Sequence, residues 1–118
     1  MFKGCNVTVM VSDLTKAVDF YTKTLGLKLA LLAKGHWATI AAPGLTIGLH
    51  PSSEHGPQPG NSESLSIGLE VDDLSKAMEE LKKKGIEFGY VLDDKEVKVV
   101  FFKDQDNNPL YLAQVIKK

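Results

Sequence analysis

The chain contains no arginine: all 14 of its basic residues are lysines, and 15 acidic residues give a net charge of −1. Without a strongly basic surface the chain has little to hold a phosphate backbone, so we expect no nucleic-acid partner. The planar guanidinium group that most often clamps phosphates and carboxylates is also missing. Multiply anionic ligands are therefore disfavoured.

Cysteine and long apolar runs are scarce as well. Cys5 is the single cysteine, so no disulfide can form within the chain. No apolar run approaches the roughly 20 residues that span a bilayer. The first residues lack the apolar core of a secretory signal. These absences predict a cytoplasmic protein with no membrane partner. We expect Cys5 itself to be a small buried hydrophobic residue.

What the sequence does contain is an internal repeat. Residues 6–17 align with residues 66–77, an offset of 60 positions. Identical residues occupy the paired positions Val11 and Val71, Asp13 and Asp73, Leu14 and Leu74, Lys16 and Lys76, and Ala17 and Ala77. The repeat predicts two similar modules within a single domain that spans residues 1–118.

Each copy predicts a strand, a helix and three further strands. Alternating apolar residues open each copy as a strand, and Asp13 or Asp73 then stands at the expected helix N-cap. Gly26 and Gly85 are placed to end the two helices. The remaining strands are expected at 28–32, 36–42 and 45–50 in the first copy, and near 88–92, at 97–103 and at 110–115 in the second.

These elements divide the chain into a first module at 4–50, a linker at 51–64 and a second module at 65–116. The linker holds three prolines, two glycines and four serines, a composition that favours neither helix nor strand. Both modules therefore read β-α-β-β-β, which makes the predicted fold class α+β.

This arrangement resembles the vicinal oxygen chelate superfamily of glyoxalases, bleomycin-resistance proteins and extradiol dioxygenases. The resemblance covers essentially the whole chain, and it implies two tandem modules that form an open cleft of mixed β-sheet, usually in a homodimer. The segments that carry it are Val9–Leu14 with Ala17, Phe20-Tyr21, Leu25-Gly26-Leu27, and the Asp- and Asn-rich run 104–108 ahead of the last strand.

The metal-using members of that superfamily hold their ion with His, Gln and Glu from the first and last strand of each module. The resemblance places those positions here at Asn6, Gly48, Ser66 and Tyr111. None of the four is a good ligand for zinc, nickel or ferrous iron, which prefer imidazole or carboxylate. We therefore expect neither a metal nor another cofactor.

The three histidines do not restore such a site. His36, His50 and His55 have no metal-binding spacing and fall at two strand ends and in the linker. His50 shares the strand parity of Gly48, so it either faces the cleft near its rim or lies on the surface at the strand end. It is the one candidate general base.

The remaining cleft residues are neutral and typical of a small-molecule pocket. Trp37 and Phe101 either form its aromatic walls or pack in the core, while Tyr111 faces the cleft because Leu110 and Leu112 should face the core. Gly68 leaves room, and Thr46 shares the cleft parity. The candidate ligand-binding residues are Asn6, Thr8, Trp37, Gly48, His50, Ser66, Phe101 and Tyr111.

The sequence thus favours a metal-independent binding protein that sequesters a largely neutral aromatic or apolar ligand. Two alternatives stay open. One is a glyoxalase-like lyase or isomerase, or a dioxygenase, with a non-standard metal site or with His50 as its general base. The other is a regulatory module whose cleft docks a partner chain.

Overall fold

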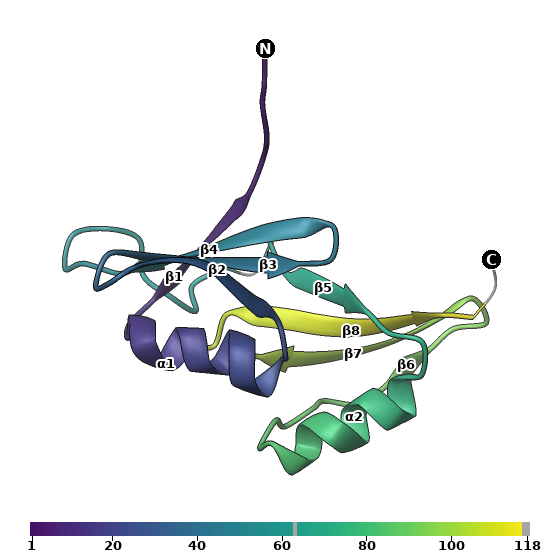
Figure 1. Ribbon diagram of the computed structural model, residues 1–118. Helices are drawn as coiled ribbons and strands as arrows, with labels where there is room; N and C mark the ends of the chain where they lie inside the picture. The colour runs from purple at the N-terminus through teal and green to yellow at the C-terminus, as the bar shows by residue number, and fades with distance from the viewer. Residues whose placement is uncertain (63, 117–118) are drawn as a thin grey trace. The chain divides into compact units, whose positions relative to one another are not determined.

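The computed structural model describes residues 1–62 and 64–116 of the chain. Its Cα atoms form two compact units, unit 1 at Met1–Asn61 and unit 2 at Ser62–Lys118. Each unit runs strand, helix and three strands, and each contains one four-stranded mixed sheet (Figure 1). The expected α+β class and the tandem β-α-β-β-β modules are therefore confirmed.

Unit 1 has the strand order β1-β4-β3-β2, with β1 parallel to β4 and the other neighbours antiparallel. The helical segment between β1 and β2 starts the crossover that this parallel pair requires. The elements are β1 (Val7–Val11), α1 (Leu14–Asp19), the π-helical turn η1 (Phe20–Thr24), β2 (Lys28–Ala33), β3 (Trp37–Ala42) and β4 (Leu45–Pro51).

Unit 2 repeats this topology with the order β5-β8-β7-β6, and β5 runs parallel to β8. The 60-residue repeat in the sequence therefore corresponds to a repeat in strand connection. The elements are β5 (Ile67–Glu70), α2 (Leu74–Lys83), β6 (Leu92–Asp93), β7 (Val97–Lys103) and β8 (Pro109–Val115).

The two helices begin at the aspartates that the sequence indicated. The Asp13 carboxylate accepts a hydrogen bond from the Lys16 backbone N–H at 3.1 Å, and Asp73 accepts one from Lys76 at 3.0 Å. Such caps satisfy a backbone donor that the first helical turn leaves without a partner. After the helical segments, Gly26 and Gly85 have φ values of 77° and 96°, the left-handed conformation that favours glycine.

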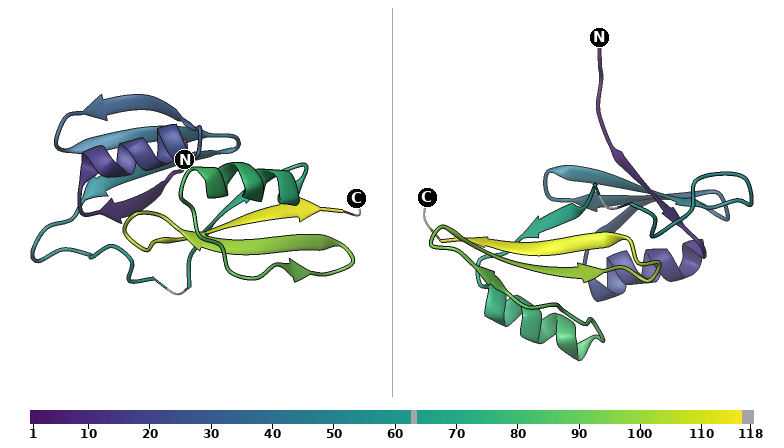
Figure 2. Two further views of the ribbon diagram at one scale, coloured as in Figure 1. Left: turned by 90° about the horizontal axis from the view of Figure 1, so that it is seen from below. Right: turned by 180° about the vertical axis from the view of Figure 1, so that it is seen from behind.

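One face of each sheet packs against its own helix and forms the core (Figure 2). In unit 1 the α1 residues Leu14 and Ala17 are buried, as is Tyr21 in the turn that follows. Removing such apolar surface from water is the main source of stability. The buried strand residues are Val9, Val11, Ala38, Ile40, Ile47 and Leu49 in unit 1, and Val100, Phe102, Leu110 and Leu112 in unit 2.

A buried aspartate organises the turn between β7 and β8. One oxygen of the Asp104 carboxylate accepts hydrogen bonds from the backbone N–H groups of Asp106 and Asn108 at 2.8 and 2.9 Å. Its other oxygen accepts from the Asn108 side chain at 2.9 Å. Asn107 reverses the chain with a φ of 65°. The Asp- and Asn-rich run therefore has a structural role in starting β8.

The prediction of a strand near 88–92 is wrong for most of that segment, because β6 contains only Leu92 and Asp93. Phe88 instead contacts Phe102 on the core side, with ring centroids 5.5 Å apart. Gly89 makes one backbone hydrogen bond to the Phe101 carbonyl, at 3.2 Å. Packing of Phe88 into the core thus takes precedence over strand pairing.

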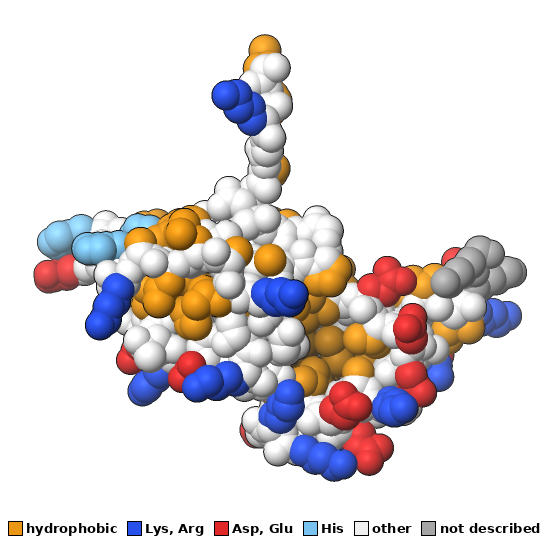
Figure 3. All heavy atoms as spheres, viewed as in Figure 1, with side chains coloured by type: hydrophobic (Ala, Val, Ile, Leu, Met, Phe, Trp, Pro, Cys, Tyr) orange, Lys and Arg blue, Asp and Glu red, His pale blue; other side chains and the backbone are white. Residues whose placement is uncertain are grey.

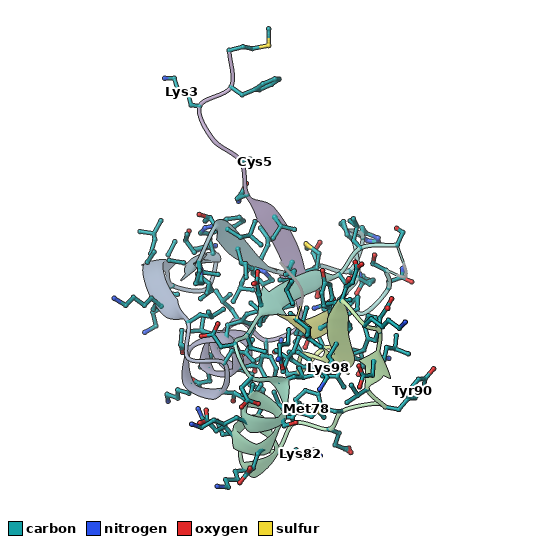
Figure 4. The ribbon with its side chains drawn as sticks, turned by 90° about the vertical axis from the view of Figure 1, so that its right-hand side faces the viewer. Lys3, Cys5, Met78, Lys82, Tyr90 and Lys98 are labelled. Atoms are coloured by element: carbon teal, nitrogen blue, oxygen red, sulfur yellow. The ribbon has the colours of Figure 1, made fainter. Side chains whose placement is uncertain are left out.

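The expectation of a buried Cys5 is also wrong, since its side chain is exposed. Cys5 lies on the extended segment that precedes β1 and projects from unit 1 (Figure 4). Within the part of the chain that the structure describes, no strand pairs with that segment, and the ladder between β1 and β4 begins at Val7. None of the helices in residues 1–62 and 64–116 is long and apolar enough to cross a bilayer.

Candidate functional site

Each sheet has a second face, opposite its helix, which we call the open face of that unit. Successive strand residues point to opposite faces, so the residues between the core positions belong to this open face. In unit 1 the open face carries Thr8 and Gly48, which are paired across β1 and β4. In unit 2 it carries Gly68 and Tyr111, paired across β5 and β8.

On the open face of unit 1, the indole of Trp37 lies over Gly48. A Cβ atom at Gly48 would come 2.2 Å from Trp37 Cη2, a distance that no real Cβ tolerates. The Asn6 side-chain Nδ2 would lie 3.3 Å from the same Cβ. Because residue 48 has no side chain, the Trp37 ring and the Asn6 amide group can both lie over β4 at this position.

Hydrogen bonding fixes how the indole lies on this face. Trp37 Nε1 donates to Thr39 Oγ1 at 2.7 Å. The His50 ring contacts Trp37 edge to face, with centroids 6.1 Å apart. Thr39 was not among the residues expected from the sequence, although its strand parity with Trp37 could have indicated it.

His50 is exposed at the end of β4, and a hydrogen bond to the next residue orients its ring. Its Nδ1 lies 2.8 Å from the carbonyl oxygen of Pro51, which can only accept. Nδ1 must therefore carry the proton, and in the neutral ring Nε2 is then left as an acceptor. The other two histidines are also exposed, His36 between β2 and β3 and His55 in the loop after β4.

On the open face of unit 2, the ring of Tyr111 lies over Gly68. A Cβ at Gly68 would come 2.1 Å from Tyr111 Cζ and 2.3 Å from the phenol oxygen. Phe101 pairs with Tyr111 across β7 and β8, and the two rings lie 5.8 Å apart at an interplanar angle of 54°. Phe101 remains 48% exposed, so this aromatic pair faces solvent and is not part of the core.

The structure thus brings the sequence-predicted residues together in two groups, one in each unit. Asn6, Trp37, Gly48 and His50 gather on the open face of unit 1, and Thr8 lies there beside Gly48. The second group lies on the open face of unit 2. It consists of Tyr111, Phe101 and Ser66, an exposed residue directly before β5 whose parity matches Gly68.

The residues at the four positions that the family resemblance assigns to metal ligands do not suit a transition metal. Asn6, Ser66 and Tyr111 offer amide and hydroxyl groups, whereas zinc and ferrous iron prefer imidazole, thiolate or carboxylate. Gly48 has no side chain, and the Trp37 ring occupies the space where one would project. Within residues 1–62 and 64–116, no three His, Cys, Asp or Glu side chains are close enough to hold an ion together.

Three comparisons with known proteins bear on this geometry. A family model described as the Glyoxalase/Bleomycin resistance protein/Dioxygenase superfamily matches residues 6–112. That range includes the candidate ligand-binding residues of both units, from Asn6 to Tyr111. A search of curated protein sequences found no match.

Solved structures of similar fold include an antibiotic-binding protein, TnmS3 from Streptomyces sp. CB03234, which is 27% identical with a TM-score of 0.74 over 98% of this chain and 100% of that one. A superfamily member from Sphaerobacter thermophilus DSM 20745 is 27% identical, with a TM-score of 0.78 over 97% and 98% of the two chains. The fosfomycin resistance protein FosX from Listeria monocytogenes is 18% identical, with a TM-score of 0.77 over 98% of this chain and 96% of that one. At this low identity the likeness shows the fold alone.

Proposed function

The chain belongs to the glyoxalase/bleomycin resistance protein/dioxygenase superfamily, and on that basis we propose that it binds a small aromatic or apolar molecule without a metal ion. The ligand's ring system is largely neutral, and the protein sequesters it without transforming it. The proposed ligand-binding residues are those that the two open faces present, above all Trp37, Phe101 and Tyr111.

The observation that carries this proposal is the Tyr111 ring over Gly68, beside an exposed Phe101. An aromatic pair on an exposed sheet face costs solvation unless something covers it. A planar ligand stacked there would bury apolar surface on both partners, and the hydroxyl groups of Tyr111 and Ser66 would orient it. The 27% identity with an antibiotic-binding protein of full-length coverage supports the same class of function.

The proposal is tested by titrating EDTA-treated, 15N-labelled protein with naphthalen-1-ylmethanol, a neutral two-ring probe, and following backbone amide signals by NMR. We expect saturable shifts confined to the open faces, at Gly48 or at Gly68 and Tyr111. The variant Tyr111→Ala should lose the shifts in unit 2. Absence of saturation, or shifts scattered over both helices, would contradict the proposal.

One observation favours a second candidate function, a glyoxalase-like lyase or isomerase with His50 as general base. The Pro51 carbonyl oxygen holds the proton on Nδ1, and in the neutral ring this leaves Nε2 able to accept a proton from a substrate. If this is the function, His50→Ala should abolish turnover of an α-oxo substrate such as methylglyoxal and leave the naphthalen-1-ylmethanol shifts at Gly68 and Tyr111 of unit 2 unchanged. Equal turnover by both proteins would exclude that role.

We also propose that the protein acts in the cytoplasm as a homodimer. Three leucines of the edge strand β2 are exposed on unit 1, and hydrophobic side chains gather on its visible surface (Figure 3). Apolar surface of this kind is typical of association sites. Light scattering should give twice the chain mass, and Leu31→Lys should lower it to one chain if β2 contributes to the contact.

A further inference from the structure

Among the strand residues of unit 2, Glu70 provides the one carboxylate on the open face that carries the aromatic pair. Glu70 is the last residue of β5 and pairs with Ala113 of β8, which in turn pairs with Val99 of β7. Its side chain therefore points to the same face as Gly68 and Tyr111. Glu70 is exposed, and among residues 1–62 and 64–116 its carboxylate has no hydrogen-bond or ion-pair partner.

The strand residues that share a row with this carboxylate across the sheet are apolar. Ala113, Val99 and Leu92 continue the row that Glu70 begins, across β8, β7 and β6. The next row holds Gly68 under the Tyr111 ring. Glu70 and Gly68 are two positions apart along β5, a Cα separation of roughly 7 Å. A group attached to a ring that stacks on Tyr111 would therefore lie within reach of the carboxylate.

Among the strand residues of unit 2, the lysine on this face does not neutralise Glu70. Of the two lysines in β7, Lys98 pairs with Gln114 on the helix side of the sheet, and Lys103 pairs with Pro109 on the open face. Four residues along β8 and two strand spacings separate the Glu70 and Lys103 positions, roughly 16 Å between Cα atoms. That distance is about twice the Debye length of ~8 Å at physiological ionic strength, so dissolved salt largely screens the attraction between the two charges.

We propose that the open face of unit 2 selects aromatic molecules that carry a protonated amine. The ring stacks on Tyr111 beside Phe101, and the ammonium group lies against the Glu70 carboxylate. The ring faces also favour a nearby cation, because their quadrupoles present negative charge to it. This inference rests on the proposed function and narrows it, since the ligand now has one positive charge beside its neutral ring system.

A matched pair of probes tests this selection. Naphthalen-1-ylmethylamine, protonated at pH 7, and naphthalen-1-ylmethanol share one ring and differ in the charge of the attached group. We expect the amine to bind about three- to tenfold more tightly than the alcohol, the scale of an exposed ion pair combined with a cation–π contact. NMR shifts of the Gly68 and Tyr111 amides measure both affinities at the same site.

The variant Glu70→Gln keeps the shape of the side chain and removes its charge. In Glu70→Gln the preference for the amine should fall below the wild-type ratio to the part that the cation–π contact supplies, with the alcohol unchanged from the wild type. Glu87→Gln is the control, because it removes an exposed carboxylate from the loop after α2 and changes the net charge equally. That control should retain the preference, and raising the salt concentration should reduce it in the wild type.

The outcomes separate this inference from the function on which it rests. Equal binding of the two probes to the wild type would overturn the amine selection and leave aromatic binding intact. A preference that stays at the wild-type ratio in Glu70→Gln would also overturn it, because the charge would then be recognised elsewhere. Failure of both probes to bind would refute the proposed function together with the inference.

Discussion

Tyr111 covers Gly68 so closely that a Cβ at residue 68 would come within 2.1 Å of the phenol Cζ atom. The two residues are direct partners across β5 and β8, and Gly68 does not have a positive φ. The glycine is therefore required by the ring above it and not by the backbone. Unit 1 contains the same kind of relationship between Trp37 and Gly48, although there the aromatic residue belongs to the neighbouring strand β3.

Gly68→Ala should displace the Tyr111 ring and destabilise the protein. Overpacking of this kind costs about 1–3 kcal/mol, and the rotated ring would no longer form the stacking surface. Urea unfolding measures the loss of stability, and naphthalen-1-ylmethanol binding measures the loss of the site. Gly89→Ala is the matched control, since a Cβ there meets nothing within 4 Å and its φ is not positive. A Gly68→Ala protein with wild-type stability and binding would show that Tyr111 is not held in this position.

Tyr111→Ala should weaken binding of the neutral probe by about 1–3 kcal/mol, the scale for losing an aromatic contact together with a hydrogen bond. Tyr111→Phe separates the two contributions, because it keeps the ring and removes the hydroxyl. Tyr90→Ala serves as the control: this tyrosine is 81% exposed and projects outward from the loop before β6 (Figure 4). An unchanged dissociation constant in Tyr111→Ala would remove Tyr111 from the site.

Gly48→Ala should move the indole of Trp37 off β4. Because Trp37 is the single tryptophan of the chain, its fluorescence reports on this position alone. Displacement of the ring into water and loss of its hydrogen bond to Thr39 should shift the emission to longer wavelength. Thr39→Val removes the hydrogen bond and leaves room for the ring, so its shift should be smaller. Identical spectra for wild type and Gly48→Ala would contradict the close contact.

Asp73→Ala should destabilise the protein by about 1 kcal/mol, the usual cost of losing a helix N-cap. The carboxylate of Asp73 accepts the Lys76 backbone N–H at 3.0 Å, and alanine offers no acceptor. Asp72→Ala is the control, because it changes the charge equally at an exposed residue outside the helix. Equal urea midpoints for the two variants would mean that the cap contributes no stability.

The sequence predicted the features that depend on local chemistry. Asp13 and Asp73 were expected at helix caps because a short acceptor side chain satisfies the first backbone donors, and both accept as expected. The period-two pattern placed Leu110 and Leu112 in the core and thereby Tyr111 on the opposite face, and both leucines are buried. The repeat also gave the tandem β-α-β-β-β order, which is confirmed.

The sequence could not predict contacts that depend on side-chain direction. Parity places Trp37 and Gly48 on one face, but it does not reveal that the indole leans across β4 to cover Gly48 and bonds to Thr39. Burial of Cys5 was expected from its small apolar side chain, whereas its exposure follows from the point where strand pairing begins. Phe88 was expected in a strand, but it packs against Phe102 instead and does not join the sheet.

The most direct test of metal-independent aromatic binding is one dissociation constant measured under two conditions. Naphthalen-1-ylmethanol is titrated against EDTA-treated protein, and against protein soaked in zinc, nickel, manganese or ferrous iron and then desalted. We predict the same dissociation constant in every sample, because Asn6, Gly48, Ser66 and Tyr111 offer no suitable ligand set. Binding that appears only in a metal-soaked sample, with one ion retained per chain, would contradict the account and make a metal-dependent site the correct description.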